Sequence, residues 1–380
     1  MNYSKINNLL AWLCGLIAFV LYAFTVDQSI SWWDTGEFIA ASDKLEIVHQ
    51  PGAPLFLLIQ NLFSNLAFGN KEHVAIWMNL GSAFCSALTI VFLFWTITAL
   101  ARKLLLGKTE GNKLQNIQIF AAGAVGAMAY AFTDSFWYSA VESEVYAMSS
   151  LCTAIVFWLA LKWERRADEP DSNKWLLLIA YVMGLSIGVH LLNLLTIPAL
   201  ALLIYFRKSQ HVTLKGAAKS FAWGVLALAF ILWGVIQYSV KIAAGFDLFF
   251  VNSLGMPFGS GIILFVLLLV STAVFGIIYS IRNNKPILNL LILGTCLVFF
   301  GFTSFSMILI RAQTNISLNN NDPDNAFSFL GYLSREQYQS EPLFKGPTFN
   351  SKVVDVNEST GYRKDAERYE KFDNVKGYKY

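Results

Sequence analysis

Charged residues are scarce in this sequence. Only 14% of the 380 residues are charged, against roughly 25% in ordinary soluble domains, and 56% are hydrophobic. This balance excludes a soluble globular core. The formal net charge is +3 and the basic residues are scattered, so the composition also excludes a basic nucleic-acid-binding face.

Cysteines and metal- or nucleotide-binding motifs are also few or missing. The four cysteines lie singly inside apolar runs with no CxxC spacing, at Cys14, Cys85, Cys152 and Cys296. This pattern gives no disulfide framework and no zinc site. There is no Gly-rich phosphate loop and no HExxH motif, so nucleotide-sugar chemistry has no predicted site. We predict no cofactor and no metal, with a carboxylate-bound divalent ion left open.

Long apolar runs dominate what is present, and a bilayer crossing needs about 20 such residues. The runs predict an all-α integral membrane protein with about nine transmembrane helices. They lie near residues 8–24, 74–101, 117–132, 144–161, 175–188, 190–206, 220–243, 261–281 and 287–310. The run at 52–68 is ambiguous, and we assign it to an outer interfacial or re-entrant helix.

Charge bias sets the predicted orientation. With 52–68 left on the outer surface, the N-terminal tail and the inner loops hold 15 Lys and Arg, whereas the outer loops before residue 311 hold three. Basic residues favour the cytoplasmic side. The N-terminus is therefore predicted inside. The sequence divides into a transmembrane domain at 1–310, with a first outer loop at 25–72, and a short soluble outer tail at 311–380.

The first outer loop carries the strongest candidate for chemistry. Its sequence WWDTGEFIAAS places Asp34 and Glu37 three residues apart, hence on one face of a helical turn. Two tryptophans suit an interfacial belt that would hold Asp34 where a lipid phosphate meets water. Asp34 could act as a general base with Glu37 beside it. Equally, Asp34 could simply cap the following helix.

A second outer loop, FWYSAVESEVYA, holds two acids among aromatic residues. Glu142, Glu144 and Tyr146 resemble the parts of a sugar platform at a membrane rim. A carboxylate at a helix start is also favoured by the helix dipole alone, which leaves a purely structural role open for one of the acids.

Further polar residues lie at predicted membrane boundaries. His190 and Asn193 lie at a turn between two short crossings, where polar groups are costly unless used, although a lone histidine is more often structural. Arg311 and Asn315 follow the last crossing. An arginine there can bind a phosphate with its two-pronged guanidinium, or serve as a snorkelling anchor. The Asn- and Asp-rich run at 319–325 indicates turns first.

The combined motifs resemble a known family. WWDTGEFIAAS with HQPGAPLF, then FWYSAVESEVYA, GVHLLNLLTIPAL and RAQTNISLNNNDPDNAFSFLGYLSREQY, are similar to the DUF2723 family, bacterial relatives of the TMEM260-like protein O-mannosyltransferases in the GT-C superfamily. The resemblance covers nearly the whole chain. Carried over residue by residue, it puts the acidic position at Asp34 and the His-Pro turn at His49 and Pro51. Gln50 stands where many relatives have a second proline, which leaves the conformation of this turn open.

The resemblance implies an inverting glycosyltransferase. It would move a sugar, mannose by analogy, from a polyprenyl-phosphate donor to Ser or Thr of an exported protein, at the periplasmic face of a bacterial inner membrane. Expected partners are the bilayer, the lipid-linked sugar, the acceptor protein and a possible partner subunit, with no nucleic acid. Three alternatives stay open: a non-catalytic scaffolding subunit, a transporter or flippase, and an enzyme with a lipid or glycan acceptor.

Overall fold

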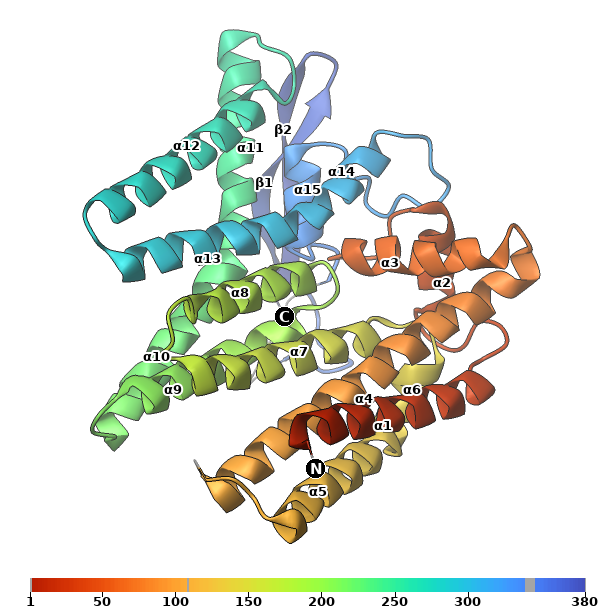
Figure 1. Ribbon diagram of the computed structural model, residues 1–380. Helices are drawn as coiled ribbons and strands as arrows, with labels where there is room; N and C mark the ends of the chain where they lie inside the picture. The colour runs from red at the N-terminus through yellow and green to blue at the C-terminus, as the bar shows by residue number, and fades with distance from the viewer. Residues whose placement is uncertain (1, 108, 339–345, 380) are drawn as a thin grey trace. The chain divides into compact units, whose positions relative to one another are not determined.

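The computed structural model describes residues 2–107, 109–338 and 346–379. The chain forms two compact units, which we describe separately. Unit 1 contains residues 1–46, 53–228 and 290–305, and unit 2 contains residues 47–52, 229–289 and 306–380. Figure 1 shows the elements in chain order. The predicted division at residue 310 stays a prediction.

Unit 1 is built from α-helices and short 3-10 turns. Its helices are α1 Tyr3–Thr25, α2 Thr35–Lys44, α3 Pro54–Ser64, α4 Val74–Leu106, α5 Lys113–Ala131, α6 Asp134–Val141, α7 Val145–Arg166, α8 Asn173–Ile187, α9 Ile197–Lys208, and most of α10 Leu214–Ala229 and α13 Pro286–Phe302. Its 3-10 turns are η1 Asn65–Ala67, η2 Lys71–His73, η3 Leu191–Thr196 and η5 Thr303–Phe305. Helices α1, α4 and α5 lie side by side (Figure 1).

Small residues let α1 approach α4 closely. Ala11, Cys14, Gly15 and Ala18 repeat at helical spacing and are buried. A Cβ on Gly15 would lie 2.4 Å from the Cγ2 atom of Val91 in α4, so only glycine fits at this contact. Without water to drive helices together inside a bilayer, such close backbone packing is what holds membrane helices.

Unit 2 combines helices with a β-hairpin. It contains a π-helical segment Phe230–Tyr238, α11 Ser239–Leu254, α12 Ser260–Arg282, α14 Ser306–Ala312, α15 Ala326–Leu333, β1 Asp355–Asp365 and β2 Arg368–Lys379. The two strands pair antiparallel from Asp355 opposite Lys379 to Asp365 opposite Arg368, with one irregularity in register after Asn357. The sequence did not lead us to expect this hairpin in the polar tail.

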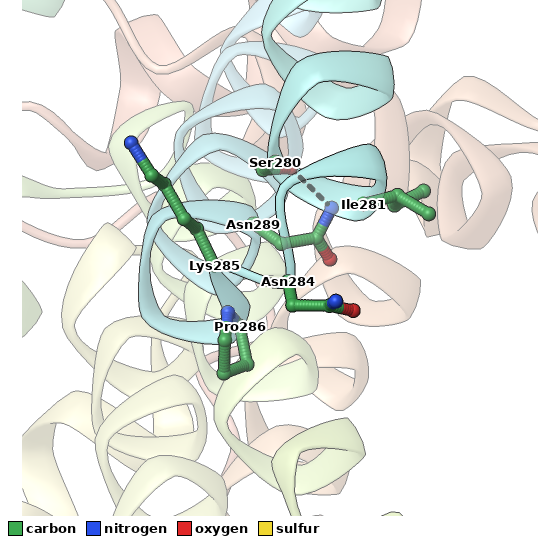
Figure 2. A pocket seen from close by; sticks show the side chains of 6 residues that line it. All are labelled: Ser280, Ile281, Asn284, Lys285, Pro286 and Asn289. Atoms are coloured by element: carbon green, nitrogen blue, oxygen red, sulfur yellow. Dashed lines mark hydrogen bonds between the residues drawn. The ribbon is translucent and has the colours of Figure 1, made fainter.

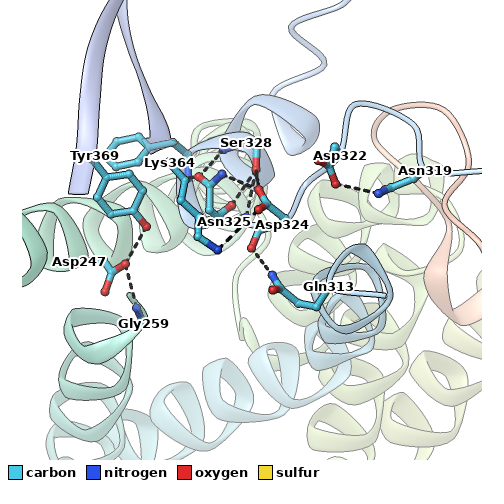
Figure 3. A network of polar contacts seen from close by, with 11 residues as sticks. Asp247, Gly259, Gln313, Asn319, Asp322, Asp324, Asn325, Ser328, Lys364 and Tyr369 are labelled. Atoms are coloured by element: carbon cyan, nitrogen blue, oxygen red, sulfur yellow. Dashed lines mark hydrogen bonds and ion pairs between the residues drawn. The ribbon is translucent and has the colours of Figure 1, made fainter. Parts of the chain in front are cut away.

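A buried carboxylate joins the hairpin to α11 and α12. Asp247 of α11 is fully buried. It accepts hydrogen bonds from the backbone N–H groups of Gly259 (3.1 Å) and Gly261 (3.0 Å) at the start of α12, and from the Tyr369 hydroxyl of β2 (2.8 Å; Figure 3). The Asn252 side chain accepts from the Tyr369 N–H at 2.9 Å and donates to its carbonyl at 2.7 Å. The hairpin is therefore tied to α11 by three hydrogen bonds of Tyr369, one to Asp247 and two to Asn252.

The chain is an all-α polytopic membrane protein, as predicted. Among the described residues, seven helical stretches are long and apolar enough to cross a membrane, or eight if the pair Lys113–Ala131 and Asp134–Val141, bent by 68°, forms one span. The predicted crossing at 175–188 corresponds to α8, which has only 15 residues. The run assigned to an outer helix forms a short apolar stretch, Pro54–Ala67, below spanning length. The predicted side of each loop stays a prediction.

Candidate functional site

The first acidic motif lies at the start of α2. Asp34 is the N-cap residue and Glu37 lies in the first turn. One carboxylate oxygen of each lies within 4.8 Å of the other; Asp34 is exposed and Glu37 is half-buried. The expected sharing of one face is therefore present. Two carboxylates at this separation offer oxygen ligands that a divalent cation prefers, although such an ion needs additional ligands.

The backbone before this pair is unusual. Trp33 has a φ of +62°, in the left-handed region that bulky residues rarely adopt. Such conformations cost of order 1–3 kcal/mol and persist where the surroundings impose them. The side chains of Trp32 and Trp33 are 85% and 95% exposed, so both indole rings are available to an interface. The predicted aromatic anchor thus has the required exposure.

Helix capping does not account for Asp34. Its backbone carbonyl accepts from the N–H of Phe38 at 2.9 Å, which begins the helix, but its carboxylate makes no capping hydrogen bond. Asp34 is in the αR region, with φ −82° and ψ −5°. Capping residues normally have extended backbone, which aims the side chain at the N–H groups of the first turn. Asp34 therefore occupies the N-cap position of α2 without its carboxylate serving as the cap.

Helix α3 packs against α2. Phe38 and Phe56 make a T-shaped contact at 5.2 Å. The Asn61 amide donates to the carbonyl of Ser42 at 2.8 Å and to that of Asp43 at 3.0 Å. These polar contacts satisfy C-terminal carbonyls of α2 and fix α3 beside it. The acidic pair thus begins a helix that is held by specific contacts along its length.

The second outer loop connects to the first loop through Glu142. The Ser31 hydroxyl donates to the carboxylate of Glu142, which ends α6. The backbone N–H of Asp27 donates to the carbonyl of Val141 at 3.1 Å. Asn79 of α4, fully buried, donates to the carbonyl of Asp27 at 2.8 Å. The two predicted acidic loops are therefore joined to each other by hydrogen bonds.

Glu144 and Tyr146 lie at the start of α7. The Glu144 carboxylate accepts from the N–H of Val145 at 3.3 Å, and the side chain is buried at 7% exposure. Glu144 thus has the helix-start position that the sequence indicated. Tyr146 is 49% exposed, and its ring packs against the ring of His190 with centroids 5.5 Å apart.

The turn after α8 brings His190 and Asn193 into this region of unit 1. His190 accepts from the N–H of Leu192 through Nδ1 at 3.2 Å, which in the neutral ring leaves the proton on Nε2. Asn193 is fully buried and donates to the Ser186 hydroxyl at 3.1 Å. Its amide oxygen has no hydrogen-bond partner among the described residues. The amide oxygens of Asn7, Gln60, Asn79 and Asn319 share this feature, so it is the position of Asn193 beside His190 that makes it a candidate for ligand contact.

The carbonyl of Gly188 ties this turn to α3. It accepts hydrogen bonds from the N–H groups of Leu55 at 2.8 Å and Phe56 at 3.2 Å. These N–H groups lie in the first turn of α3 and therefore have no partner within the helix. A Cβ on Gly188 would lie 2.4 Å from the Ser304 hydroxyl oxygen and 2.9 Å from the Cβ of Leu55. Only a residue without a side chain lets the turn and α3 approach this closely.

The remaining three predicted residues belong to unit 2. His49 is half-buried, and its carbonyl lies 3.3 Å from the Tyr332 hydroxyl, which donates to the carbonyl of Val48 at 2.5 Å. Arg311 is half-buried near the end of α14, and Asn315 is exposed three residues after that helix. The Gln50–Pro51 peptide bond is cis. The sequence had left the conformation of this turn open.

The Asn- and Asp-rich run makes turns, as the sequence indicated. The Asn319 amide donates to Asp322 at 2.7 Å, and Asn325 caps α15 in a reciprocal arrangement with Ser328 (Figure 3). Gln313 donates to the carbonyl of Asp324, and the carboxylate of Asp324 lies 3.9 Å from the ammonium group of Lys364.

Three polar residues of interest were missed at the sequence level. Ser31 connects the two loops and Asn79 ties the first loop to α4, but their partners lie about 110 and 50 positions away in the chain. Asp247 was assigned to an outer loop because the predicted crossing ended at residue 243. The sequence feature that could have predicted the burial of Asp247 is the pair Gly259 and Gly261, because glycines permit close backbone approach to a carboxylate.

Comparisons with known proteins match the part of the chain that contains most of these residues. Residues 34–213 match the family described as the N-terminal domain of protein O-mannosyl-transferase TMEM260. The mouse protein O-mannosyl-transferase TMEM260 is 28% identical over 178 residues, which is 47% of this chain and 22% of the mouse protein. The protein O-mannosyl-transferase tmem260 of Dictyostelium discoideum is 22% identical over 180 residues, which is 46% of this chain and 20% of that protein. The matches therefore span about a fifth of the length of these relatives. No solved structure matches the chain.

Proposed function

We propose that the chain is a membrane glycosyltransferase that modifies protein hydroxyls, because residues 34–213 match the N-terminal domain family of protein O-mannosyl-transferase TMEM260. The donor would be a polyprenyl-phosphate sugar, with mannose as the sugar, and the acceptor would be Ser or Thr of an exported protein. The observation that carries the proposal is the Asp34–Glu37 pair, because the Asp34 carboxylate is exposed, does not cap its helix, and begins the matched segment.

In the proposed reaction Asp34 is the general base. The acceptor hydroxyl oxygen attacks C1 of the sugar, the C1–O bond to the phosphate breaks, and the hydroxyl proton passes to the Asp34 carboxylate. The lipid phosphate leaves, and the configuration at C1 inverts. Because the phosphate is already a good leaving group, the protein mainly has to orient the hydroxyl and keep out water. Glu37, beside Asp34, would orient the hydroxyl or the donor.

The other candidates have supporting roles in this proposal. Tyr146 and His190 provide an aromatic surface with a ring N–H for sugar hydroxyls, and Asn193 provides a buried acceptor. Glu144 shapes the start of α7, and Glu142 holds the two outer loops together through Ser31. Arg311 is the candidate partner for a lipid phosphate because a guanidinium can bind two phosphate oxygens. His49 and Asn315 stay candidates for substrate contact, and these loops are proposed to face the periplasm.

Transfer in cells tests the proposal. Exported proteins of cells lacking this chain would be compared by mass spectrometry after return of the wild type, Asp34→Asn or Asp134→Asn. Asp134 is an exposed acid of the second outer loop and serves as the matched control. We expect a hexose-containing modification with the wild type and with Asp134→Asn, but not with Asp34→Asn. Full modification with Asp34→Asn would instead favour the scaffolding alternative.

A further inference from the structure

A hollow lies at the turn between α12 and α13, in unit 2 and outside the matched segment. It has a volume of about 450 Å³ and is lined by Ser280, Ile281, Asn284, Lys285, Pro286 and Asn289 (Figure 2). No carboxylate is among these residues. The lining of the hollow therefore combines polar and apolar side chains with one cation and no acid.

Hydrogen bonds of the turn fix the walls of the hollow. The N–H of Lys285 donates to the carbonyl of Ser280 at 2.8 Å, and the Asn289 amide donates to the Ser280 hydroxyl at 2.9 Å, as Figure 2 shows. Asn284 has a φ of +50°, a left-handed conformation that asparagine tolerates, and this reverses the chain. The site is thus formed before any ligand arrives.

Two positive charges lie at this turn: Lys285 in the lining of the hollow and Arg282 three residues before it, at the end of α12. Arg282 and Lys285 are exposed, and within the described part of the chain neither makes an ion pair. The sequence between residues 248 and 321 contains no Asp or Glu at all. The Lys285 ammonium lies 3.0 Å from the Tyr279 hydroxyl and 4.8 Å from the centre of its ring, which holds it near the end of α12.

Two basic residues near other helix ends are neutralised by acids. Lys103 pairs with Glu164, and Arg207 pairs with Asp168, whose pKa the Arg207 guanidinium lowers. Positive-inside bias explains why cations gather at such ends, but it does not require a hollow beside them. The combination at 280–289 therefore points to an anionic ligand.

Exposed apolar side chains flank the hollow on both helices. Ile278 and Ile281 of α12 are exposed, and so are Ile287 and Leu288 of α13. Both helices belong to candidate membrane spans, so we expect the turn between them at the depth of lipid headgroups. A ligand with a phosphate in the hollow and acyl chains along these side chains matches both features.

We propose that this hollow binds the phosphate of an anionic phospholipid, with Arg282 and Lys285 as the cationic partners and the apolar faces of α12 and α13 in contact with its acyl chains. Basic pockets between membrane helices suit such headgroups, because each Lys or Arg near a charged membrane surface adds to binding. The site is separate from the proposed glycosyltransferase site and does not depend on it.

Lipid retention by the purified full chain tests this site. Native mass spectrometry would count the lipids retained from micelles that contain equal phosphatidylglycerol and phosphatidylcholine. Arg282→Gln with Lys285→Gln should lower phosphatidylglycerol retention by roughly tenfold. The matched control, Lys215→Gln with Lys219→Gln, removes two exposed charges from another predicted inner loop and should retain the wild-type level. Equal losses in the two double variants would overturn the proposal.

Two further measurements keep the proposal falsifiable if the charge variant misfolds. Ile281→Trp keeps both cations and adds a bulky ring to the wall of the hollow, so it should also lower phosphatidylglycerol retention; unchanged retention would contradict the site. Millimolar inorganic phosphate should leave the lipid bound. Displacement by phosphate alone would reassign the hollow to a free anion, and equal retention of phosphatidylcholine would remove the role of charge.

Discussion

At the residue scale, Asp34 and Asp247 show how neighbours decide what a carboxylate can do. Asp34 follows a left-handed tryptophan, lies exposed and leaves its helix uncapped. Asp247 is fully buried and accepts three hydrogen bonds. Three donors repay much of the cost of burying a charge, which suits a structural role, whereas an exposed carboxylate can receive a proton from a substrate.

Tyr369 makes the Asp247 contact sensitive to high pH. Burial, then its hydrogen bond to Asp247 and the charge of that carboxylate, raise the pKa of Tyr369 above its ordinary value of 10.0. The folded chain therefore holds this proton more tightly than the unfolded chain does. The resulting stabilisation is complete below pH 10 and is lost as the pH rises through the folded pKa.

We expect proteolytic release of the hairpin to increase above pH 10 in the wild type. In Tyr369→Phe, release should already be higher at pH 8, because Asp247 loses one hydrogen-bond donor at a cost of about 1–3 kcal/mol. The increase in release above pH 10 that comes from Tyr369 should be absent in this variant. Limited proteolysis between pH 8 and 11 measures both effects. An unchanged pH profile in Tyr369→Phe would contradict the assignment.

The acidic pair could be predicted at the residue scale, but several of its supports could not. Asp34 and Glu37 are three residues apart, so helical geometry brings them together. The link from Ser31 to Glu142 and the burial of Asp247 depend on segments more than 100 residues away. Local periodicity contains no information about such pairs.

At the element scale, the turn after α8 acts as a support for α3. Gly188 gives its carbonyl to the first N–H groups of that helix, and α3 in turn packs against α2, which Asp34 begins. The position of the acidic pair therefore depends on a glycine about 150 residues later in the chain.

Gly188→Ala should destabilise unit 1 by about 1–3 kcal/mol, because the added methyl group overpacks the contact with Leu55 and Ser304. Thermal unfolding in detergent measures the loss. Gly245→Ala is the matched control: a Cβ there meets nothing within 4 Å, and its melting temperature should not fall. Equal melting temperatures for the two variants would show that the contact does not hold α3.

The same scale explains which elements were predicted. Long apolar runs identified most of the helices, because hydropathy and length suffice for a membrane span. The turn between α12 and α13 also lies beside the basic residues Arg282 and Lys285, between the crossings predicted at 261–281 and 287–310. The hairpin at 355–379 was missed because its strands are polar on both faces, so they lack the apolar alternation of a half-buried strand. Its docking to α11 depends on Asn252 and Asp247 instead.

Asp247→Asn should loosen both the hairpin and the start of α12. The amide keeps one acceptor oxygen, so it cannot serve all three donors, and it loses the charge that favours a helix N-terminus. We expect faster cleavage of residues 346–354 in limited proteolysis. Asp365→Asn, at an exposed position of the hairpin, should be cleaved at the wild-type rate; a matching increase there would indicate general loosening.

At the scale of the whole molecule, the orientation in the membrane is the main expectation still open. Charge bias predicts residues 102–116 on the cytoplasmic side and the second outer loop on the opposite side. A membrane-impermeant maleimide should label Ser135→Cys in intact spheroplasts, and Thr109→Cys only after permeabilisation. The native cysteines are buried or half-buried, which keeps the background low. The reverse labelling pattern would invert the topology and move the Asp34 loop to the cytoplasm.

The most direct test of the account is sugar transfer by the purified chain. A synthetic polyprenyl-phosphate mannose and a Ser/Thr-rich acceptor peptide would be supplied, and the mannosylated peptide would be measured over time for the wild type, Asp34→Asn and Asp134→Asn. We predict transfer by the wild type and by Asp134→Asn, and a rate lower by about 10²-fold or more for Asp34→Asn, the usual cost of losing a general base. Equal rates in all three proteins would contradict the role of Asp34.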